Sequence, residues 1–104
     1  MSATTVVNLR RGPFDVYIGR AGRGMDGYFG NPFDVRVHGA SAMPKFIEYF
    51  HKRLMTDPEF KRRVIALAGK RLGCFCKPAD CHGDVIAAWV NDWSKATNTS
   101  QEHA

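Results

Sequence analysis

Short runs of β-branched and aromatic residues alternate along the chain with longer stretches that have apolar residues at every third or fourth position. Residues 4–9, 15–19 and 70–76 are the short runs, and each predicts a strand. Four glycines in residues 20–30 predict a loop after the second strand. The cysteine-containing run 70–76 is therefore the last strand of the pattern.

Helical spacing appears first in two consecutive segments. Residues 41–55 begin at Ser41, a residue type that caps helices, and carry apolar residues at spacings of three and four. Residues 58–67 follow Asp57, which is a second candidate cap, and begin with a proline at the first helical position. We expect two helices that supply much of the packing.

A third helix is predicted over residues 84–93. One face of it carries Val85, Ile86, Trp89 and Val90. We expect this face to pack against a sheet in which residues 6–9 and 71–76 are neighbouring strands. The pattern predicts a small single-domain α/β protein with about three to four strands, partly parallel, and about three helices. The domain would span residues 1–94, and residues 95–104 would form a polar, frayed tail.

Length and composition limit the class of protein. With 104 residues and 44% hydrophobic side chains, the chain is long enough for one core and too short for two ordinary domains. It has no apolar run of about 18 residues that would span a membrane, and its first residues lack the pattern of a secretory signal. Three cysteines, an odd number, suit a reducing compartment better than a disulfide framework. We therefore expect a soluble, cytoplasmic protein.

The charge favours a negatively charged partner. The formal net charge is +5, and basic residues gather in the first quarter and the third quarter of the chain. The alternative is that these residues only solvate the surface. We expect the partner to be a phosphate-bearing small molecule or a nucleic acid, and the sequence indicates no particular cofactor.

The chemistry is concentrated in residues 74–84. Cys74 and Cys76 are two apart on the predicted strand, so their side chains point to one face. Cys81, His82 and Asp84 come where the last helix begins. A helix N-terminus has unpaired N–H groups and a partial positive charge, which stabilise a phosphate, a carboxylate or a thiolate.

Three interpretations of this cluster stay open. In the first, it is a catalytic or ligand-binding site, with Cys76 or Cys81 as a thiolate and His82 or Asp84 as a proton carrier or orienting group. In the second, Cys74 joins Cys76, Cys81 and His82 as a zinc site, which has the right ligands in number but an unusual spacing. In the third, the cysteines are core residues and the His and Asp only stabilise the helix terminus.

The order of several short segments resembles a known family. They are VVNLRR, DVYIGR, GNPF, GKRLGCFCKP and CHGDVIAAWVN. Together they are similar to the bacterial and phage family catalogued as domain of unknown function 4326. The resemblance covers about residues 6–91 and implies a recurring site without implying a reaction.

The resemblance also marks residues outside the cysteine cluster, and we expect five of them to bind the ligand. These are Asn8, Arg10, Arg20, Gly30 and Asn31. Arg10 and Arg20 each follow a predicted strand, where a guanidinium can grip a phosphate with two hydrogen bonds. Asn31 has the simpler explanation of a turn former before a proline.

Three functions compete on these residues. The leading hypothesis is a nucleotide- or nucleic-acid-directed domain, enzymatic in character, that transfers or hydrolyses a group of a phosphate-bearing ligand. The second is a non-catalytic module, such as a phage accessory protein, that binds a nucleotide or DNA. The third is a small zinc-stabilised protein-interaction domain. The usual signatures of phosphate-loop NTPases, serine hydrolases and zinc metalloproteases are absent from the sequence.

Overall fold

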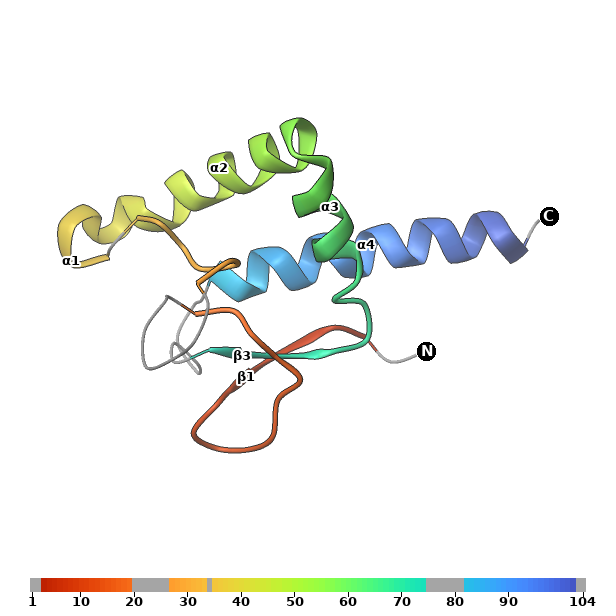
Figure 1. Cartoon of the computed structure of the whole chain (residues 1–104), viewed down its shortest axis with the longest axis horizontal. Coiled ribbons are helices and arrows are strands. Elements are labelled where there is room, and N and C mark those ends of the chain that lie inside the picture. Colours follow the sequence, from red (N-terminus) through yellow and green to blue (C-terminus); the bar gives the residue numbers. More distant parts are fainter. Residues whose placement is uncertain (1–2, 20–26, 34, 75–81, 103–104) are drawn as a thin grey trace.

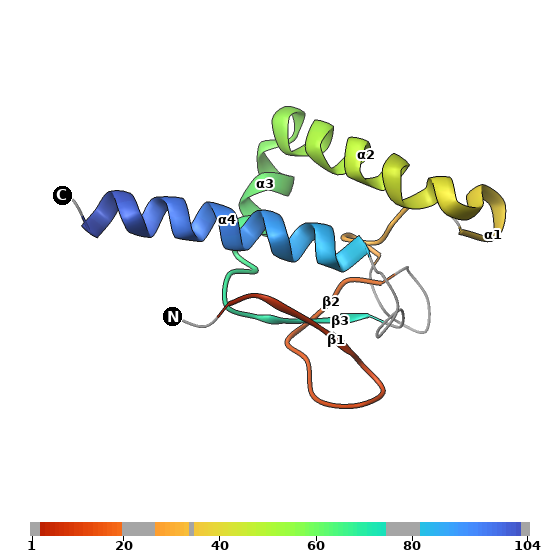
Figure 2. The same ribbon diagram turned by 180° about the vertical axis from the view of Figure 1, so that it is seen from behind.

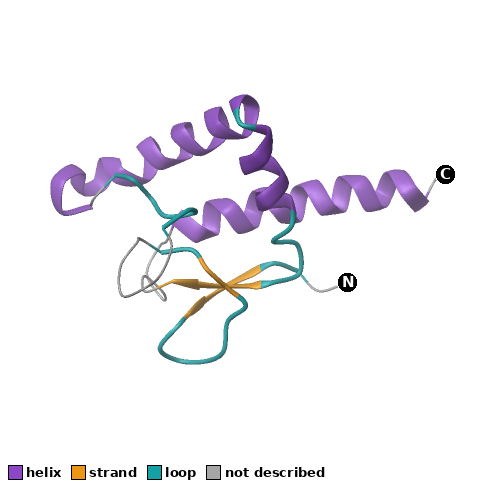
Figure 3. Ribbon diagram, in the orientation of Figure 1, coloured by secondary structure: helices purple, strands orange, loops and turns teal. Residues whose placement is uncertain are grey.

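The described part of the chain forms one sheet with helices stacked on one side of it (Figure 1). This computed structural model describes residues 3–19, 27–33, 35–74 and 82–102. Figure 3 separates the two layers by colour, with the helices on one side and the strands on the other. The predicted α/β class is confirmed, and the described sheet has three strands, the lower of the two numbers expected.

All the described strands are parallel. They are β1 (Thr5–Asn8), β2 (Val16–Tyr17) and β3 (Arg71–Cys74), in the order β1-β3-β2. The prediction that the first strand and the cysteine-containing strand are neighbours is confirmed, since β1 pairs with β3. Leu72 of β3 pairs with Val6 of β1 on one side and with Val16 of β2 on the other. The two valines are β-branched, and β-branched side chains favour strands, which explains why these short runs form strands.

The connection from β1 to β2 crosses the sheet on the face away from the helices. Figures 1 and 2 show residues 9–15 as a loop below the sheet, while all the helices lie above it. Phe14 lies against Gly73 of β3, so a Cβ on this glycine would be only 2.6 Å from Phe14 Cγ. The central strand therefore needs a glycine where the aromatic ring of the crossing loop passes over it.

Two helices form the outer layer, as the apolar spacing predicts. They are α2 (Ala42–Thr56) and α3 (Pro58–Ile65). In α2 the buried residues Ala42, Phe46, Phe50 and Leu54 recur every fourth position. Asp57 caps α3, since its Oδ1 accepts a hydrogen bond from Phe60 N at 3.1 Å.

The segment before α2 corrects the prediction at Ser41. A short helix α1 (Val35–His38) and a 3-10 turn η1 (Gly39–Ser41) precede α2, and the apolar pattern predicted neither of them. Because this turn leads into α2, Ser41 already has helical backbone angles, and its side chain makes no cap bond. Its Oγ instead donates to His38 O at 2.7 Å. The predicted side-chain cap is therefore wrong.

The last helix, α4 (His82–Glu102), is longer than expected. Its apolar face ends near Trp93, but residues 95–102 contain no proline or glycine, so nothing in the local sequence breaks the helix there. The predicted end at Trp93 is wrong. The assignment of residues 1–94 to one domain and 95–104 to a tail stays a prediction.

The core lies between the sheet and the helices. Leu72 of β3 and Ile86 and Val90 of α4 are fully buried there, beside Phe46 and Phe50 of α2. Trp89 is half-buried and packs edge-on against Phe50, with ring centroids 6.4 Å apart. Of the predicted apolar face of α4, Ile86 and Val90 are therefore buried in the core, Val85 and Trp89 are half-buried against it, and the tryptophan contacts α2.

No helix among the described residues is long and apolar enough to cross a membrane.

Candidate functional site at the carboxyl end of the sheet

The carboxyl ends of the strands meet at one edge of the sheet. Asn8 is the last residue of β1 and pairs with Cys74, the last residue of β3. Ile18 follows β2 directly, and its N–H donates to Gly73 O at 3.0 Å. In an open parallel sheet this edge is the usual place for a ligand, because loops of different origin converge there.

His82 joins the first turn of α4 to this edge. Its Nε2 lies 2.7 Å from Ile18 O, and the residue is only 6% exposed. Since a carbonyl oxygen only accepts, Nε2 carries the proton and donates it. The edge of the ring packs against Phe46, with centroids 5.2 Å apart. The imidazole thus attaches the N-terminus of α4 to the residue that follows β2.

Gly83 lets α4 approach the sheet closely. A Cβ at this position would lie 2.4 Å from Ile18 Cδ1 and 3.2 Å from Val6 Cγ1. Since 2.4 Å is far shorter than van der Waals contact, a side chain here would force either the Ile18 side chain or the helix to shift. His82 and Gly83 together therefore set where the N-terminus of α4 lies and how closely it approaches the sheet.

The first turn of α4 carries one acidic residue, Asp84, which is half-buried. A carboxylate in the first turn is stabilised by the partial positive charge of the helix terminus. The same N–H groups and partial charge suit a phosphate oxygen. The edge thus combines hydrogen-bond donors for an anion with a carboxylate that can accept from a hydroxyl.

Cys74 is a buried thiol on the helix side of the sheet. Tyr17, in the neighbouring strand, is half-buried. Burial raises the pKa of the Tyr17 phenol, and the nearby Cys74 raises it further. The phenol of Tyr17 therefore keeps its proton at neutral pH and can act only as a neutral hydrogen-bonding group.

Three of the predicted ligand-binding residues shape turns. Asn8 Oδ1 accepts a hydrogen bond from Arg10 N at 2.9 Å, which closes the turn after β1. Arg10 itself is exposed. Asn31 Oδ1 accepts a hydrogen bond from Phe33 N at 2.8 Å. This bond forms a turn, which is the simpler role that the sequence predicted for Asn31. Gly30 N donates to Gly27 O at 2.9 Å. Contact of these residues with a ligand stays a prediction.

Part of the predicted site lies outside the described residues. These residues are Arg20, Cys76 and Cys81. Within the described ranges, no three His, Cys, Asp or Glu side chains lie close enough to hold a metal ion. The zinc alternative needs Cys76 and Cys81 as well as Cys74 and His82, so it also stays a prediction.

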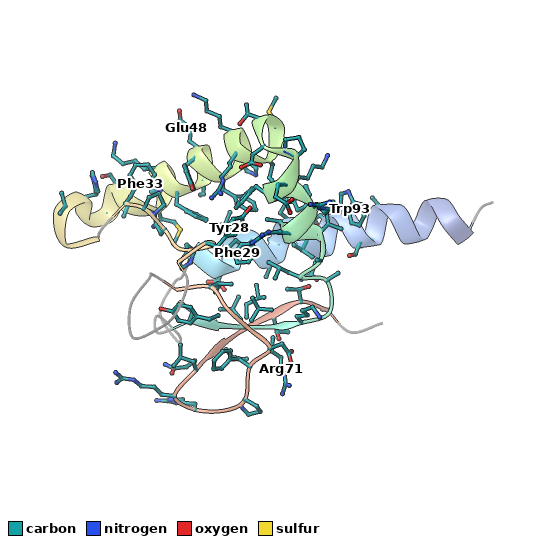
Figure 4. All side chains as sticks on the ribbon, in the orientation of Figure 1. Tyr28, Phe29, Phe33, Glu48, Arg71 and Trp93 are labelled. Atoms are coloured by element: carbon teal, nitrogen blue, oxygen red, sulfur yellow. The ribbon has the colours of Figure 1, made fainter. Side chains whose placement is uncertain are left out.

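A cation-aromatic cluster in the helix layer escaped the sequence analysis. The guanidinium of Arg53, on α2, lies 4.1 Å from the ring centre of Phe60 and 4.9 Å from that of Tyr28. Its Nη1 donates to Tyr49 Oη at 2.9 Å. Tyr28 and Phe29 lie between the helices in Figure 4, so Arg53 ties the segment 27–33 to the helix layer. One arginine inside an amphipathic helix gives no sequence signal for such a role.

Comparison with known proteins identifies the family. The family described as a domain of unknown function, DUF4326, matches residues 4–92, which include the candidate site. The chain belongs to this family. Within it, the chain is similar to a protein of Enterobacteria phage T4 described as an uncharacterized 12.4 kDa protein in the nrdA-td intergenic region. The two are 40% identical over 86 residues, which cover 83% of this chain and 76% of the phage protein. No solved structure matches the chain.

Proposed function

We propose that this DUF4326 protein binds a phosphate-bearing ligand, a nucleotide or a nucleic acid, at the carboxyl end of its parallel sheet. The observation that carries the proposal is the 2.7 Å hydrogen bond from His82 Nε2 to Ile18 O. It holds the N-terminus of α4 at the ends of the strands, where α/β proteins bind ligands. The N–H groups of that helix turn would receive a phosphate oxygen.

The distribution of charge supports the same ligand. The chain has a formal net charge of +5. Arg10 is exposed after β1, and Arg20 follows Gly19 in the sequence, so each is close in sequence to the end of a strand. Both would contact phosphate oxygens, while Asn8, Gly30 and Asn31 would shape the loops around the ligand.

Two forms of this function differ in whether chemistry follows binding. In an enzyme, Cys76 or Cys81 would be the nucleophile, with His82 and Asp84 as proton carriers or orienting groups. In a non-catalytic module of the phage accessory kind, the site would only bind. The burial of His82 and the engagement of its Nε2 with Ile18 O favour the module, because a proton carrier must reach its ligand. In either form the protein would act in the cytoplasm.

The proposal is tested by titrating the ¹⁵N-labelled chain with ATP, a deoxynucleoside monophosphate and a short single-stranded oligonucleotide at low salt. We expect at least one to bind saturably and to shift the amide signals of Asn8, Gly19 and Gly83. Affinity should fall as salt rises, because released counterions drive part of the association with an oligonucleotide. Analysis of the ligand after incubation separates an enzyme from a binding module.

A pair of charge-matched variants locates the site. Arg20→Ala should weaken binding by about 1 to 3 kcal/mol if its contact with the phosphate is partly buried. Lys95→Ala removes the same charge but lies 13 residues along α4 from His82, a distance of about 20 Å. It should leave the affinity unchanged. The proposal fails if none of the three ligands binds saturably, or if the two variants lose affinity equally.

A further inference from the structure

The second face of the sheet is apolar toward the carboxyl ends of its strands and carries no helix layer among the described residues. Val7 and Tyr17 both pair with Gly73, and the side of Gly73 on which a Cβ would lie is filled by Phe14. These three side chains therefore share the face away from the helices, and each is half-buried. Parallel sheets are normally covered on both faces, whereas among the residues that the structure describes only 9–15 cross this one (Figures 1 and 2).

The surroundings of this face are basic. Arg10 and Arg11 are exposed in the crossing connection, and Arg71 projects on the same side of the sheet (Figure 4). Among the described residues the face has one carboxylate, Asp15, which Arg71 already holds through two side-chain hydrogen bonds of 3.1 Å. The net charge around the apolar residues is therefore positive.

We propose that this face docks an acidic amphipathic helix of another protein. Such a helix would cover Val7, Phe14 and Tyr17 with an apolar stripe, in the place where a parallel sheet usually has its second helix layer. Carboxylates on either side of the stripe would face Arg10 and Arg11, and this charge match selects an acidic partner over a neutral one. The inference concerns the face opposite the helix layer, and Arg10 is the one residue that it shares with the proposed ligand site.

Charge also decides between this partner and two others. A second copy of the chain, docked face to face, would bring the Arg10 and Arg11 side chains of both copies together, which electrostatic repulsion opposes. A nucleic acid would satisfy the arginines through its phosphates but would leave the apolar residues of the face without an apolar partner. Both remain outcomes of the test.

The test uses the full chain, labelled with ¹⁵N, and two synthetic helical peptides. Both peptides carry the same leucine stripe, flanked by glutamates in one and by lysines in the other. We expect the acidic peptide to bind saturably and to shift the amide signals of Val7, Phe14 and Tyr17, and the basic peptide not to bind. The same titration with duplex DNA and a dilution series of the chain alone test the other two partners.

Two charge-reversal variants provide the control. Arg11→Glu, on the proposed face, should lower the affinity for the acidic peptide by about tenfold or more. Lys61→Glu makes the same change at an exposed position of α3, in the helix layer, and should have little effect. The proposal is overturned if the acidic peptide does not bind saturably or if the amide signals that it shifts belong to α2 or α3. It is also overturned if both variants lose affinity for the peptide equally. It is overturned as well if DNA or self-association shifts the same amides at lower concentration.

Discussion

Asn91 holds the backbone of Thr4 through a pair of hydrogen bonds. Thr4 N donates to Asn91 Oδ1 at 2.8 Å, and Asn91 Nδ2 donates to Thr4 O at 3.0 Å. Thr4 Oγ1 also donates to Leu67 O at 3.1 Å and accepts from Gly69 N at 2.9 Å. The residue is only 3% exposed. One amide of α4 and one hydroxyl thus fix the start of β1 at the edge of the sheet.

Asn91→Ala should therefore destabilise the protein. It leaves the buried N–H and C=O of Thr4 without their side-chain partner, which costs about 1 to 3 kcal/mol in the free energy of unfolding. Urea unfolding followed by circular dichroism measures the change. Asp92→Ala, at the exposed neighbouring position of α4, is the control and should change stability little. Equal losses in the two variants would contradict the assignment.

Gly73→Ala should be costly, because its Cβ would collide with the ring of Phe14. The ring atoms Cγ and Cδ2 lie 2.6 and 2.7 Å from that position, so ring or backbone must shift, at a cost of about 1 to 3 kcal/mol. Gly12→Ala, in the same connection, has nothing within 4 Å of the new methyl group and serves as the control. Thermal unfolding of the two variants should separate them clearly, and a stable Gly73→Ala would refute the close contact.

The strands and main helices could be predicted because their signals are local. Phe46, Phe50 and Leu54 recur at helical spacing, and Asp57 before Pro58 is a cap that the structure confirms. The start of α2 was less predictable, since the cap role of Ser41 depends on whether the preceding residues are extended or helical. The helix α1 has only four residues, too few for an apolar period to show.

Acid should weaken the attachment of β3 to the crossing connection. Hydrogen bonds from Arg71 lower the pKa of Asp15 from 3.8 to about 2. The ionised carboxylate contributes its full stabilisation above about pH 4 and loses it as the pH falls toward 2. In Asp15→Asn this part of the acid dependence should be absent. Urea unfolding between about pH 5 and pH 2 measures it, with a small effect expected at an exposed pair. Identical acid dependence in both proteins would count against the ion pair.

The imidazole of His82 should carry a proton on Nε2, the nitrogen that faces Ile18 O. The ring ¹⁵N signals show directly which nitrogens carry a proton, and an Nε2 without a proton would contradict the bond to Ile18 O. His82→Ala should destabilise by about 1 to 3 kcal/mol, because the buried carbonyl of Ile18 loses its donor. His51→Ala, at an exposed position of α2, is the control and should have little effect.

The Cys74 thiol should be protected from reagents in the folded protein. It is only 1% exposed, so in a Cys76→Ser/Cys81→Ser variant the remaining thiol should react with Ellman's reagent no faster than the protein unfolds. Addition of urea should release it. Fast reaction without urea would show that the carboxyl end of β3 is open. Elemental analysis of the unchanged protein for zinc tests the metal alternative in parallel.

The candidate site was predictable in its location but less so in the roles of its residues. A cysteine-rich strand followed by Cys81-His82 at a helix start indicated the carboxyl edge, and His82 and Gly83 do lie there. The partner of His82 is a backbone carbonyl, at Ile18, which has no side-chain signature in the sequence. Gly83 likewise matters because of Ile18 and Val6, which are distant in the chain and meet it only in the fold.

The strand order has a consequence for how the chain folds during synthesis. In the described sheet, β1 and β2 each pair only with β3, and Thr5 pairs with Arg71, far along the chain. Neither of the first two strands can therefore form its ladder until most of the polypeptide has left the ribosome. Contacts so distant in sequence slow folding. Until then, α2 and α3 would be the first elements able to associate, and the sheet would assemble around the late insertion of its central strand.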